Sequence, residues 1–351
     1  MGFRRANPEK LNSYRLMSRS LISVIIPVYT YNDYFEESLL SIVNQSYKNI
    51  EIVIIDDSND VNIASVISKI NDDRIRLITG NNLGLSAALN LGIQLSNGHY
   101  IARMDSDDIA EPNRIIKQSE FLEKFNLDVC GSNIKIFGSF IQKSTFVEFD
   151  DEIKFYLLFG SPLAHPTIFA KAEVLKKINY DMQFSAAEDY DLWCRMANQG
   201  VKFGNCKDYL LNYRTHPTQA TNSNINHHEN SIKIAKNYSI NYLSSENCSK
   251  FLDMNCGFNS NYSTQDVFDL IIILKKEMDL RDIKFDVISK YLISLHTRIT
   301  NYSLKTIYNY FILIVKYKIK IDFKLVLFLV LNLFFSLDFK KKYFLFFKRF
   351  N

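Results

Sequence analysis

The sequence predicts an α/β fold in which helices cover both faces of a doubly wound, mixed sheet and a C-terminal helical extension follows. Residues 21–28 (LISVIIPV) and 50–55 (IEIVII) are predominantly apolar, as expected of parallel strands covered on both sides. Helical patterns alternate with such runs between residues 21 and 103. After about residue 222 glycine becomes scarce and Asn, Ser, Tyr and Lys dominate, which predicts the extension.

The first half of the chain reads as alternating strands and helices. Apolar side chains at helical spacing predict a helix within residues 33–47, and Asp33 and Glu36 stand at the interval of a capping box. A helical pattern around residues 63–70 precedes a third strand at residues 75–79. Asn82-Leu83-Gly84 then leads into a helix that continues through residue 93. The fourth strand ends at a group of aspartates after Arg103.

Later elements complete the predicted domain. Strands are expected at residues 129–137, 167–170 and 209–214, and a helix at residues 189–199 that Gly200 ends. The expected organisation is therefore an N-terminal extension (1–20), an α/β domain (21–221) and a helical, membrane-associating region (222–351).

Charge is distributed unevenly along the chain. Residues 301–351 carry ten Lys or Arg and two Asp, a local charge of +8, whereas the first 300 residues carry 32 basic and 36 acidic side chains. A mildly acidic body argues against nucleic-acid binding, and a basic, aromatic tail indicates an anionic surface as its partner.

The apolar run at residues 325–337 (LVLFLVLNLFFSL) is shorter than the roughly 20 residues of a spanning helix. Packing as an extra helical layer and spanning with the preceding apolar stretch are both open. Because many Phe residues flank many Lys residues, a segment lying on an anionic membrane is the favoured interpretation.

Five cysteines without CxxC spacing indicate free thiols in a reducing compartment. The N-terminal 20 residues are polar and basic, which is not the pattern of a signal peptide. We therefore expect a cytoplasmic protein that is peripheral on the inner face of the plasma membrane.

Asp105, Asp107 and Asp108 crowd the end of the fourth strand. Like charges at this density repel one another, and a divalent cation offsets the repulsion. Carboxylate oxygens suit Mg²⁺ or Mn²⁺, and such ions usually bind substrate phosphates as well. The cluster therefore predicts a metal-assisted site for a phosphorylated ligand.

Other polar motifs also follow predicted strands. Pro27 and Tyr29 follow the first strand, Asp57 the second, and Asn82 and Gly84 the third. Ligands of parallel sheets bind beyond the carboxyl ends of the strands, so these motifs should converge on one edge. Each motif alone is an ordinary turn, but together they indicate a binding site in which Asp57 accepts hydrogen bonds from a base or ribose.

The ordered motifs SVIIPVY, IVIIDDS, NNLGLSAALN, YIARMDSDD and EDYDLWCR resemble the family 2 glycosyltransferases of the Rossmann-like GT-A fold, over roughly residues 21–217. The resemblance implies a nucleotide-sugar domain in which Asp107 is the main metal ligand. It implies that Asp105 lies nearer the ribose and that Arg103 belongs to the donor site. Where the family often carries Arg, this chain has Leu89.

The resemblance also implies a catalytic base at Asp189, in the motif AEDYDLW. Such a base takes the proton from an acceptor hydroxyl as the anomeric carbon is attacked, and a base opposite the leaving group implies inversion. Helix capping explains one acid at this position, but three acids in four residues exceed what capping requires. Glu188 is a weaker candidate for the acceptor side.

The late motif YRTHP resembles the family's own, in which the position of His216 ligates the metal or touches the diphosphate. A lone histidine is more often structural. His165 and Trp193 are weaker acceptor-side candidates, and packing in the core is the alternative for Trp193.

The expected function is thus an inverting, metal-dependent hexosyltransferase. It would move a sugar from a nucleotide-diphosphate donor, UDP-linked by preference, to a saccharide or lipid-linked acceptor in bacterial surface polysaccharide synthesis. A metal-dependent phosphohydrolase ranks far lower, because its Asp-x-Asp belongs on the first strand. A catalytically degenerate scaffold is disfavoured by the retention of Asp57, Asp107, Asp189 and His216.

Overall fold

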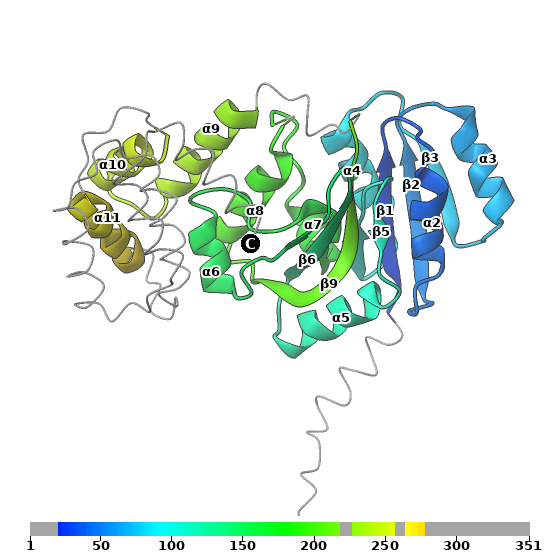
Figure 1. Ribbon diagram of the computed structural model, residues 1–351, viewed down its shortest axis with the longest axis horizontal. Coiled ribbons are helices and arrows are strands. Elements are labelled where there is room, and N and C mark those ends of the chain that lie inside the picture. Colours follow the sequence, from blue (N-terminus) through cyan, green and yellow to red (C-terminus); the bar gives the residue numbers. More distant parts are fainter. Residues whose placement is uncertain (1–19, 185, 218–226, 257–263, 278–351) are drawn as a thin grey trace, which may run out of the picture. The chain divides into compact units, whose positions relative to one another are not determined.

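The computed structural model describes residues 20–184, 186–217, 227–256 and 264–277 (Figure 1). The chain forms two compact units, which we describe separately: residues 1–153 with 161–230, and residues 154–160 with 231–351. The predicted domain boundary at residue 221 and the predicted membrane-associating tail lie outside the described residues.

The first unit begins with four parallel strands in the order β3-β2-β1-β4. The strands are β1 (Ile22–Val28), β2 (Ile50–Asp56), β3 (Ile75–Thr79) and β4 (Tyr100–Arg103). Three helices connect them, α2 (Phe35–Val43), α3 (Val61–Ile70) and α4 (Leu85–Leu95). Strand order reverses between β1 and β4, which makes the carboxyl ends of these two strands the switch point where open α/β sheets bind ligands.

The same sheet continues past β4 with strands of mixed direction, in the order β4-β8-β6-β9-β5, while β7 pairs with β6. β8 pairs antiparallel with both β4 and β6, β9 runs parallel to β6, and β5 runs antiparallel to β9. The strands are β5 (Ile109–Ala110), β6 (Val129–Gly138), β7 (Gln142–Ser144), β8 (Phe169–Lys171) and β9 (Phe203–Thr215). The sheet is therefore mixed, as the sequence predicts.

Helices follow or separate these later strands (Figure 1). They are α5 (Arg114–Lys124), α6 (Asp150–Tyr156), the 3₁₀ turn η1 (His165–Thr167), α7 (Ala172–Lys177) and α8 (Glu188–Asn198). The pairing of β9 with β5 is what matters for the site, because it brings the end of β9 beside the turn that follows β4.

The core explains why the first strands are apolar along their whole length. Every residue of β1 and β2 is buried, and α4 packs on this layer through Gly92. A Cβ atom at Gly92 would lie 2.7 Å from Cγ2 of Ile25, so the close approach of helix and sheet requires glycine.

Two local expectations are wrong. The helix expected to start at Asp33 begins at Phe35, and its N-cap Tyr34 makes no side-chain capping bond; the side chain of Asn32 instead accepts from the Tyr34 amide at 3.0 Å. The strand expected at residues 209–214 starts earlier, at Phe203. A register shift opposite Asn133 and the exposed pair Lys207-Asp208 interrupt the alternation that would have shown this.

The described part of the second unit is helical beyond the α6 region, as expected. It comprises α9 (His227–Ser239), α10 (Ser245–Cys256) and α11 (Thr264–Glu277). Phe159 packs edge-on against both Phe155 and Phe251, and the Tyr238 hydroxyl donates to the Lys154 carbonyl. Among the described residues no helix has the length and apolar character that crossing a membrane requires.

Candidate active site

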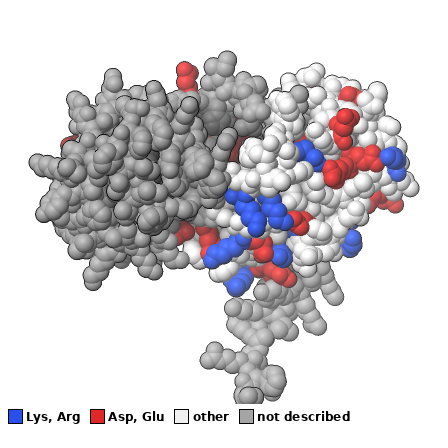
Figure 2. All heavy atoms as spheres, viewed as in Figure 1, with Lys and Arg blue, Asp and Glu red and all other residues white. Residues whose placement is uncertain are grey.

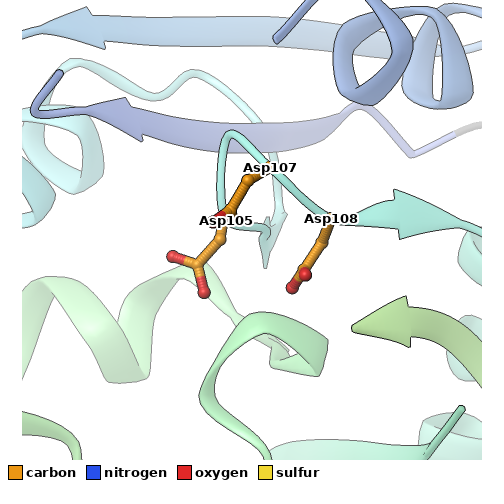
Figure 3. Close-up of side chains that lie close together, drawn as sticks. All are labelled: Asp105, Asp107 and Asp108. Carbon is orange, nitrogen blue, oxygen red and sulfur yellow. The ribbon is translucent and has the colours of Figure 1, made fainter. Parts of the chain in front are cut away.

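The three aspartates of the turn between β4 and β5 lie together at the switch point (Figure 3). One carboxylate oxygen from each of Asp105, Asp107 and Asp108 lies within 4.8 Å of the others. Each of the three has a different hydrogen-bonding partner, however, and they therefore differ in chemical character.

Asp105 is paired with a cation. Arg103, at the end of β4, donates from Nη1 to Asp105 Oδ2 at 2.9 Å and places Nη2 at 2.5 Å from Oδ1. Burial raises the pKa of Asp105 above its ordinary value, and the charges of Asp107 and Asp189 add to the shift while Arg103 opposes it. The two residues predicted to serve the donor site therefore form a fork that fixes both side chains.

Asp107 lies against a histidine from the other end of the unit. Its Oδ2 is 2.9 Å from Nε2 of His216, just beyond the end of β9. Both side chains keep limited access to solvent, 16% for Asp107 and 10% for His216. The two predicted metal ligands, 109 residues apart in sequence, are thus neighbours in the fold.

Asp108 is completely buried and differs from its neighbours. Its Oδ1 accepts from the Arg214 amide at 2.9 Å, while Oδ2 has no hydrogen-bond partner among the described residues. Burial, followed by the charges of Asp105 and Asp107, raises the pKa of Asp108 well above its ordinary value. This carboxyl group therefore favours the protonated form.

The donor set fits a divalent cation. It supplies carboxylate oxygens and one imidazole nitrogen, the ligands that suit Mg²⁺ or Mn²⁺, with the imidazole favouring Mn²⁺. Asp107 and His216 already present Oδ2 and Nε2 to each other. Asp105 is held by Arg103 and Asp108 is fully buried, whereas Asp107 and His216 both keep some access to solvent, which makes them the candidate ligand pair.

Asp57 organises the loop after β3. Its Oδ1 accepts from the Leu83 amide at 2.6 Å and its Oδ2 from the Gly84 amide at 2.8 Å. A Cβ atom at residue 80 would lie 2.5 Å from Asp57 Oδ1, so Gly80 leaves the space this carboxylate occupies. Its predicted contact with a base or ribose would add to these bonds, since each carboxylate oxygen can accept more than one.

The remaining residues predicted for the donor site lie in or just after the first and third strands. Pro27 belongs to β1, the Tyr29 side chain is mostly exposed just after it, and Asn82 and Gly84 precede α4 with positive φ angles. Leu89 is buried at 1% exposure, so this position, where the family often carries Arg, belongs to the core here.

Glu188 and Asp189 begin α8, next to a strained residue. Ala187 has a φ of 98°, a conformation that L-residues rarely adopt and that concentrates at functional sites. Glu188 is buried, and burial together with the charge of Asp189 raises the pKa of Glu188 to about 7. Asp189 is less buried, and its Oδ2 accepts from the Ser161 hydroxyl at 3.2 Å.

A buried polar group adjoins this pair. The His165 ring nitrogen Nε2 lies 2.7 Å from the Tyr180 hydroxyl, and Nδ1 lies 3.9 Å from Glu188 Oε1. Burial and the nearby Arg103 charge hold the pKa of His165 well below its ordinary value, so the imidazole is neutral. Trp193 is fully buried and meets His165 edge-on at 6.1 Å, as the packing alternative predicts.

Several residues that organise the site carried no expectation from the sequence. Arg214 contacts both Asp107 and Asp108, and Tyr34 packs on Arg214 and His216. Buried Arg114 donates to the Arg103 carbonyl at 2.6 Å, and burial lowers the pKa of this guanidinium to about 10. The only sequence signal for Arg214 was its place in YRTHP, and Tyr34 and Arg114 sit in ordinary helical contexts.

A family model matches the part of the chain that holds the first four motifs, from SVIIPVY to YIARMDSDD. The description of that model is "Glycosyl transferase family 2", and it covers residues 23–178. An uncharacterized glycosyltransferase of Haemophilus influenzae is 35% identical over 60% of this chain and 70% of its own length. The chain belongs to glycosyl transferase family 2. The O-antigen biosynthesis glycosyltransferase WbnJ of Escherichia coli is 34% identical, over 60% of this chain and 85% of WbnJ.

Two further proteins extend the comparison. An Escherichia coli UDP-Glc:alpha-D-GlcNAc-diphosphoundecaprenol beta-1,3-glucosyltransferase, WfaP, is 32% identical over 56% of this chain and 78% of its own length. The crystal structure of S. aureus TarS residues 1–349 with UDP-GlcNAc superposes with a TM-score of 0.55 at 19% identity, covering 79% of this chain and 86% of that one. The fold predicted from the sequence, GT-A, is confirmed, and the chain is a glycosyltransferase of a family with members in surface polysaccharide synthesis.

Proposed function

We propose that this glycosyltransferase transfers a hexose, with inversion, from a UDP-linked donor to a saccharide or lipid-linked acceptor in bacterial surface polysaccharide synthesis. The observation that carries the proposal is the meeting of two acidic clusters across one site. The start of α8 reaches the end of β4 through η1, because His165 Nδ1 lies 3.9 Å from Glu188 Oε1 and Ile168, just after η1, accepts from the Arg103 amide at 2.9 Å. A donor diphosphate at the aspartate turn and an acceptor at the start of α8 would therefore share one reaction centre.

Relatives support the choice of donor and acceptor. WfaP is described as using UDP-Glc and an acceptor linked to diphosphoundecaprenol, and WbnJ belongs to O-antigen synthesis. TarS has been crystallised with UDP-GlcNAc and with UDP. These descriptions favour a UDP-sugar and a surface-polysaccharide acceptor for this chain as well.

Asp107 and His216 would hold a divalent cation, Mn²⁺ by preference or Mg²⁺. When bound, such an ion stabilises the negative charge that develops on a departing nucleoside diphosphate. Arg103 adds a fixed positive charge beside Asp105. Asp57 orients the loop 82–84 through its two amide contacts, which shapes the surface near the expected base and ribose.

Asp189 would act as the general base. It would accept the proton of the acceptor hydroxyl while that oxygen attacks the anomeric carbon and the bond to the nucleoside diphosphate breaks. Attack from the face opposite the leaving group inverts the anomeric configuration. Buried Glu188 is protonated for part of the time near neutral pH and would donate a hydrogen bond on the acceptor side.

The deciding experiment is a donor screen with UDP-, GDP- and dTDP-sugars and Mn²⁺, in which nucleotide release is measured with and without candidate acceptors. The proposal predicts release of UDP that requires metal and is lost in Asp107→Asn. A phosphohydrolase would release inorganic phosphate, and a degenerate scaffold would bind no nucleotide. Either result would contradict the proposal.

The basic, aromatic tail supports a membrane location for the reaction. It would bind the anionic inner leaflet of the plasma membrane, where each lysine contributes on the order of 1 kcal/mol and Phe and Leu enter the headgroup region. Liposome co-sedimentation of the full chain and of a variant lacking residues 323–351 tests this point. We expect anionic vesicles to sediment only the full chain, and equal sedimentation of both would make the tail an ordinary packed segment.

A further inference from the structure

The side chain of Arg214 joins three segments of the first unit. Its Nε donates to the carbonyl of Asp107 at 2.8 Å, and its Nη2 lies 2.5 Å from Oε2 of Glu37 in α2. Its backbone amide donates to Asp108. The end of β9, the aspartate turn and the first turn of α2 are therefore connected through one residue.

Two aromatic rings hold the guanidinium between these contacts. The central carbon of the Arg214 guanidinium lies 4.2 Å from the ring centroid of Tyr34 and 4.5 Å from that of Phe137. Only 11% of the side chain is exposed. A planar guanidinium can stack on aromatic rings and donate in its own plane at once, whereas the ammonium group of lysine cannot.

This arrangement fixes the relative position of the two proposed metal ligands. Asp107 carries the carbonyl that Arg214 binds, and His216 follows Arg214 by two residues. The ring of Tyr34 also lies 5.4 Å from that of His216. Movement of the aspartate turn relative to the end of β9 would break the Nε contact and separate Asp107 Oδ2 from His216 Nε2.

We propose that Arg214 is a positioning residue that holds Asp107 and His216 in register before the metal and the nucleotide arrive. This inference rests on the proposed function, because it assigns the metal to that pair. Arg214 would touch neither metal nor sugar. It would reduce the free energy needed to bring the two ligands together. Residues that contact metal ligands, rather than the metal, typically contribute about 10–100-fold to metal affinity.

The test is a titration of Mn²⁺ followed by electron paramagnetic resonance, with and without UDP, on the full chain and on Arg214→Lys. Lysine keeps the positive charge, and its backbone amide can still donate to Asp108. It loses the stacking on the two aromatic rings and the simultaneous contacts to Asp107 and Glu37. We expect the Kd for Mn²⁺ to rise about 10–100-fold. Turnover should largely recover at high Mn²⁺ concentration, whereas a defect in the chemical step would not recover.

Variants at the start of α2 and at its N-cap distinguish a positioning role of Arg214 from a general effect on stability. Glu37→Gln removes the exposed end of the connection and should change the Kd by less than about fivefold, because exposed ion pairs contribute little. Glu36→Gln removes the neighbouring pair with Lys69, which is outside the cluster, and should leave the Kd unchanged. Tyr34→Leu removes one stacking face and should raise the Kd on the order of fivefold.

The outcomes distinguish the two proposals. A wild-type chain that binds no Mn²⁺ in the presence of UDP overturns the proposed metal site itself. Binding by the wild type with an equal Kd in Arg214→Lys overturns only the positioning role. Circular dichroism and thermal melting verify that each variant is folded. Should Arg214→Lys fail to fold, an unchanged Kd in Tyr34→Leu contradicts the inference in its place.

Discussion

The two acidic clusters of the site handle their negative charge in different ways. At the aspartate turn, Arg103 pairs with Asp105, and His216 lies against Asp107. At the start of α8, Glu188 is buried beside Asp189, and the nearest ring nitrogen of His165, itself neutral, is 3.9 Å away. In both clusters burial is the main cause of the raised pKa values, but the paired guanidinium of Arg103 opposes the shift at Asp105, whereas the charge of Asp189 adds to the shift at Glu188.

The difference indicates which chemistry each cluster suits. Carboxyl groups gathered next to a histidine can bind a cation, and a cation can bind phosphates. A buried carboxyl group whose pKa is raised to about 7, as that of Glu188 is, lies beside the more exposed Asp189, which suits proton transfer near neutral pH. On this account the aspartate turn serves the donor and the start of α8 serves the acceptor. On the face that Figure 2 shows, Lys and Arg side chains gather mainly near the centre and a group of Asp and Glu side chains lies toward the upper right.

The largest expected effect comes from removing one charge of the first cluster. Asp107→Asn keeps the shape of the side chain but weakens the metal site, so turnover should fall by about 10³-fold or more, or roughly 4 kcal/mol in the barrier. Steady-state rates against Mn²⁺ concentration measure the effect. The control is Asp108→Asn, because Asp108 is fully buried and bound to the Arg214 amide and is not one of the proposed ligands. A loss as large in the control would make Asp108 a metal ligand.

A slightly smaller effect is expected from the second cluster. Asp189→Asn removes the proposed base, so kcat should fall by about 10²–10⁴-fold, while the KM for the donor changes little. Glu188→Gln is the matched variant and should cost less, since a neutral amide can still donate a hydrogen bond. If Glu188→Gln abolishes turnover and Asp189→Asn does not, the roles of the two carboxyl groups are reversed.

The smallest effect concerns stability rather than rate. The pKa of Glu188 is raised from 4.5 to about 7 in the folded chain, so the folded state binds more protons than the unfolded state between these values. This contribution to the unfolding free energy is full below the unfolded pKa and is lost as pH rises through the folded pKa. Relative to Glu188→Gln, the wild type should lose roughly 2.5 kcal/mol between pH 5 and pH 8.

Urea unfolding of both proteins at these two pH values measures the difference. All other side chains are the same in both proteins, so their contributions cancel in the comparison. Parallel changes of the two unfolding free energies would show that Glu188 is ionised in the folded state throughout this range, which contradicts its burial as the main cause of the shift.

Local patterns predicted the first half of the fold better than the second. The strands β1 and β2 follow directly from runs such as Ile22–Val28, because buried parallel strands are apolar on both faces. The start of β9 was missed, because the bulge opposite Asn133 and the polar pair Lys207-Asp208 break its pattern. Pairing of β9 with the distant strands β6 and β5 leaves no comparable local signal.

The same contrast holds for the site. A cluster such as Asp105, Asp107 and Asp108 is visible in the sequence because the residues are adjacent. The neighbours that determine how it behaves come from elsewhere, Tyr34 from before α2 and Arg214 from β9. Contacts across more than one hundred residues depend on sheet order, which periodicity does not encode. The raised pKa of Glu188 results mainly from burial in the folded chain, so local sequence patterns did not predict it.

The most direct test of the division between the two clusters is a binding measurement on three proteins. Calorimetric titration with UDP and Mn²⁺ would compare the wild type, Asp107→Asn and Asp189→Asn. The account predicts metal-dependent binding of UDP by the wild type, the same affinity within about twofold for Asp189→Asn, and loss of the metal-dependent part in Asp107→Asn. Equal losses in both variants, or full binding by Asp107→Asn, would contradict it.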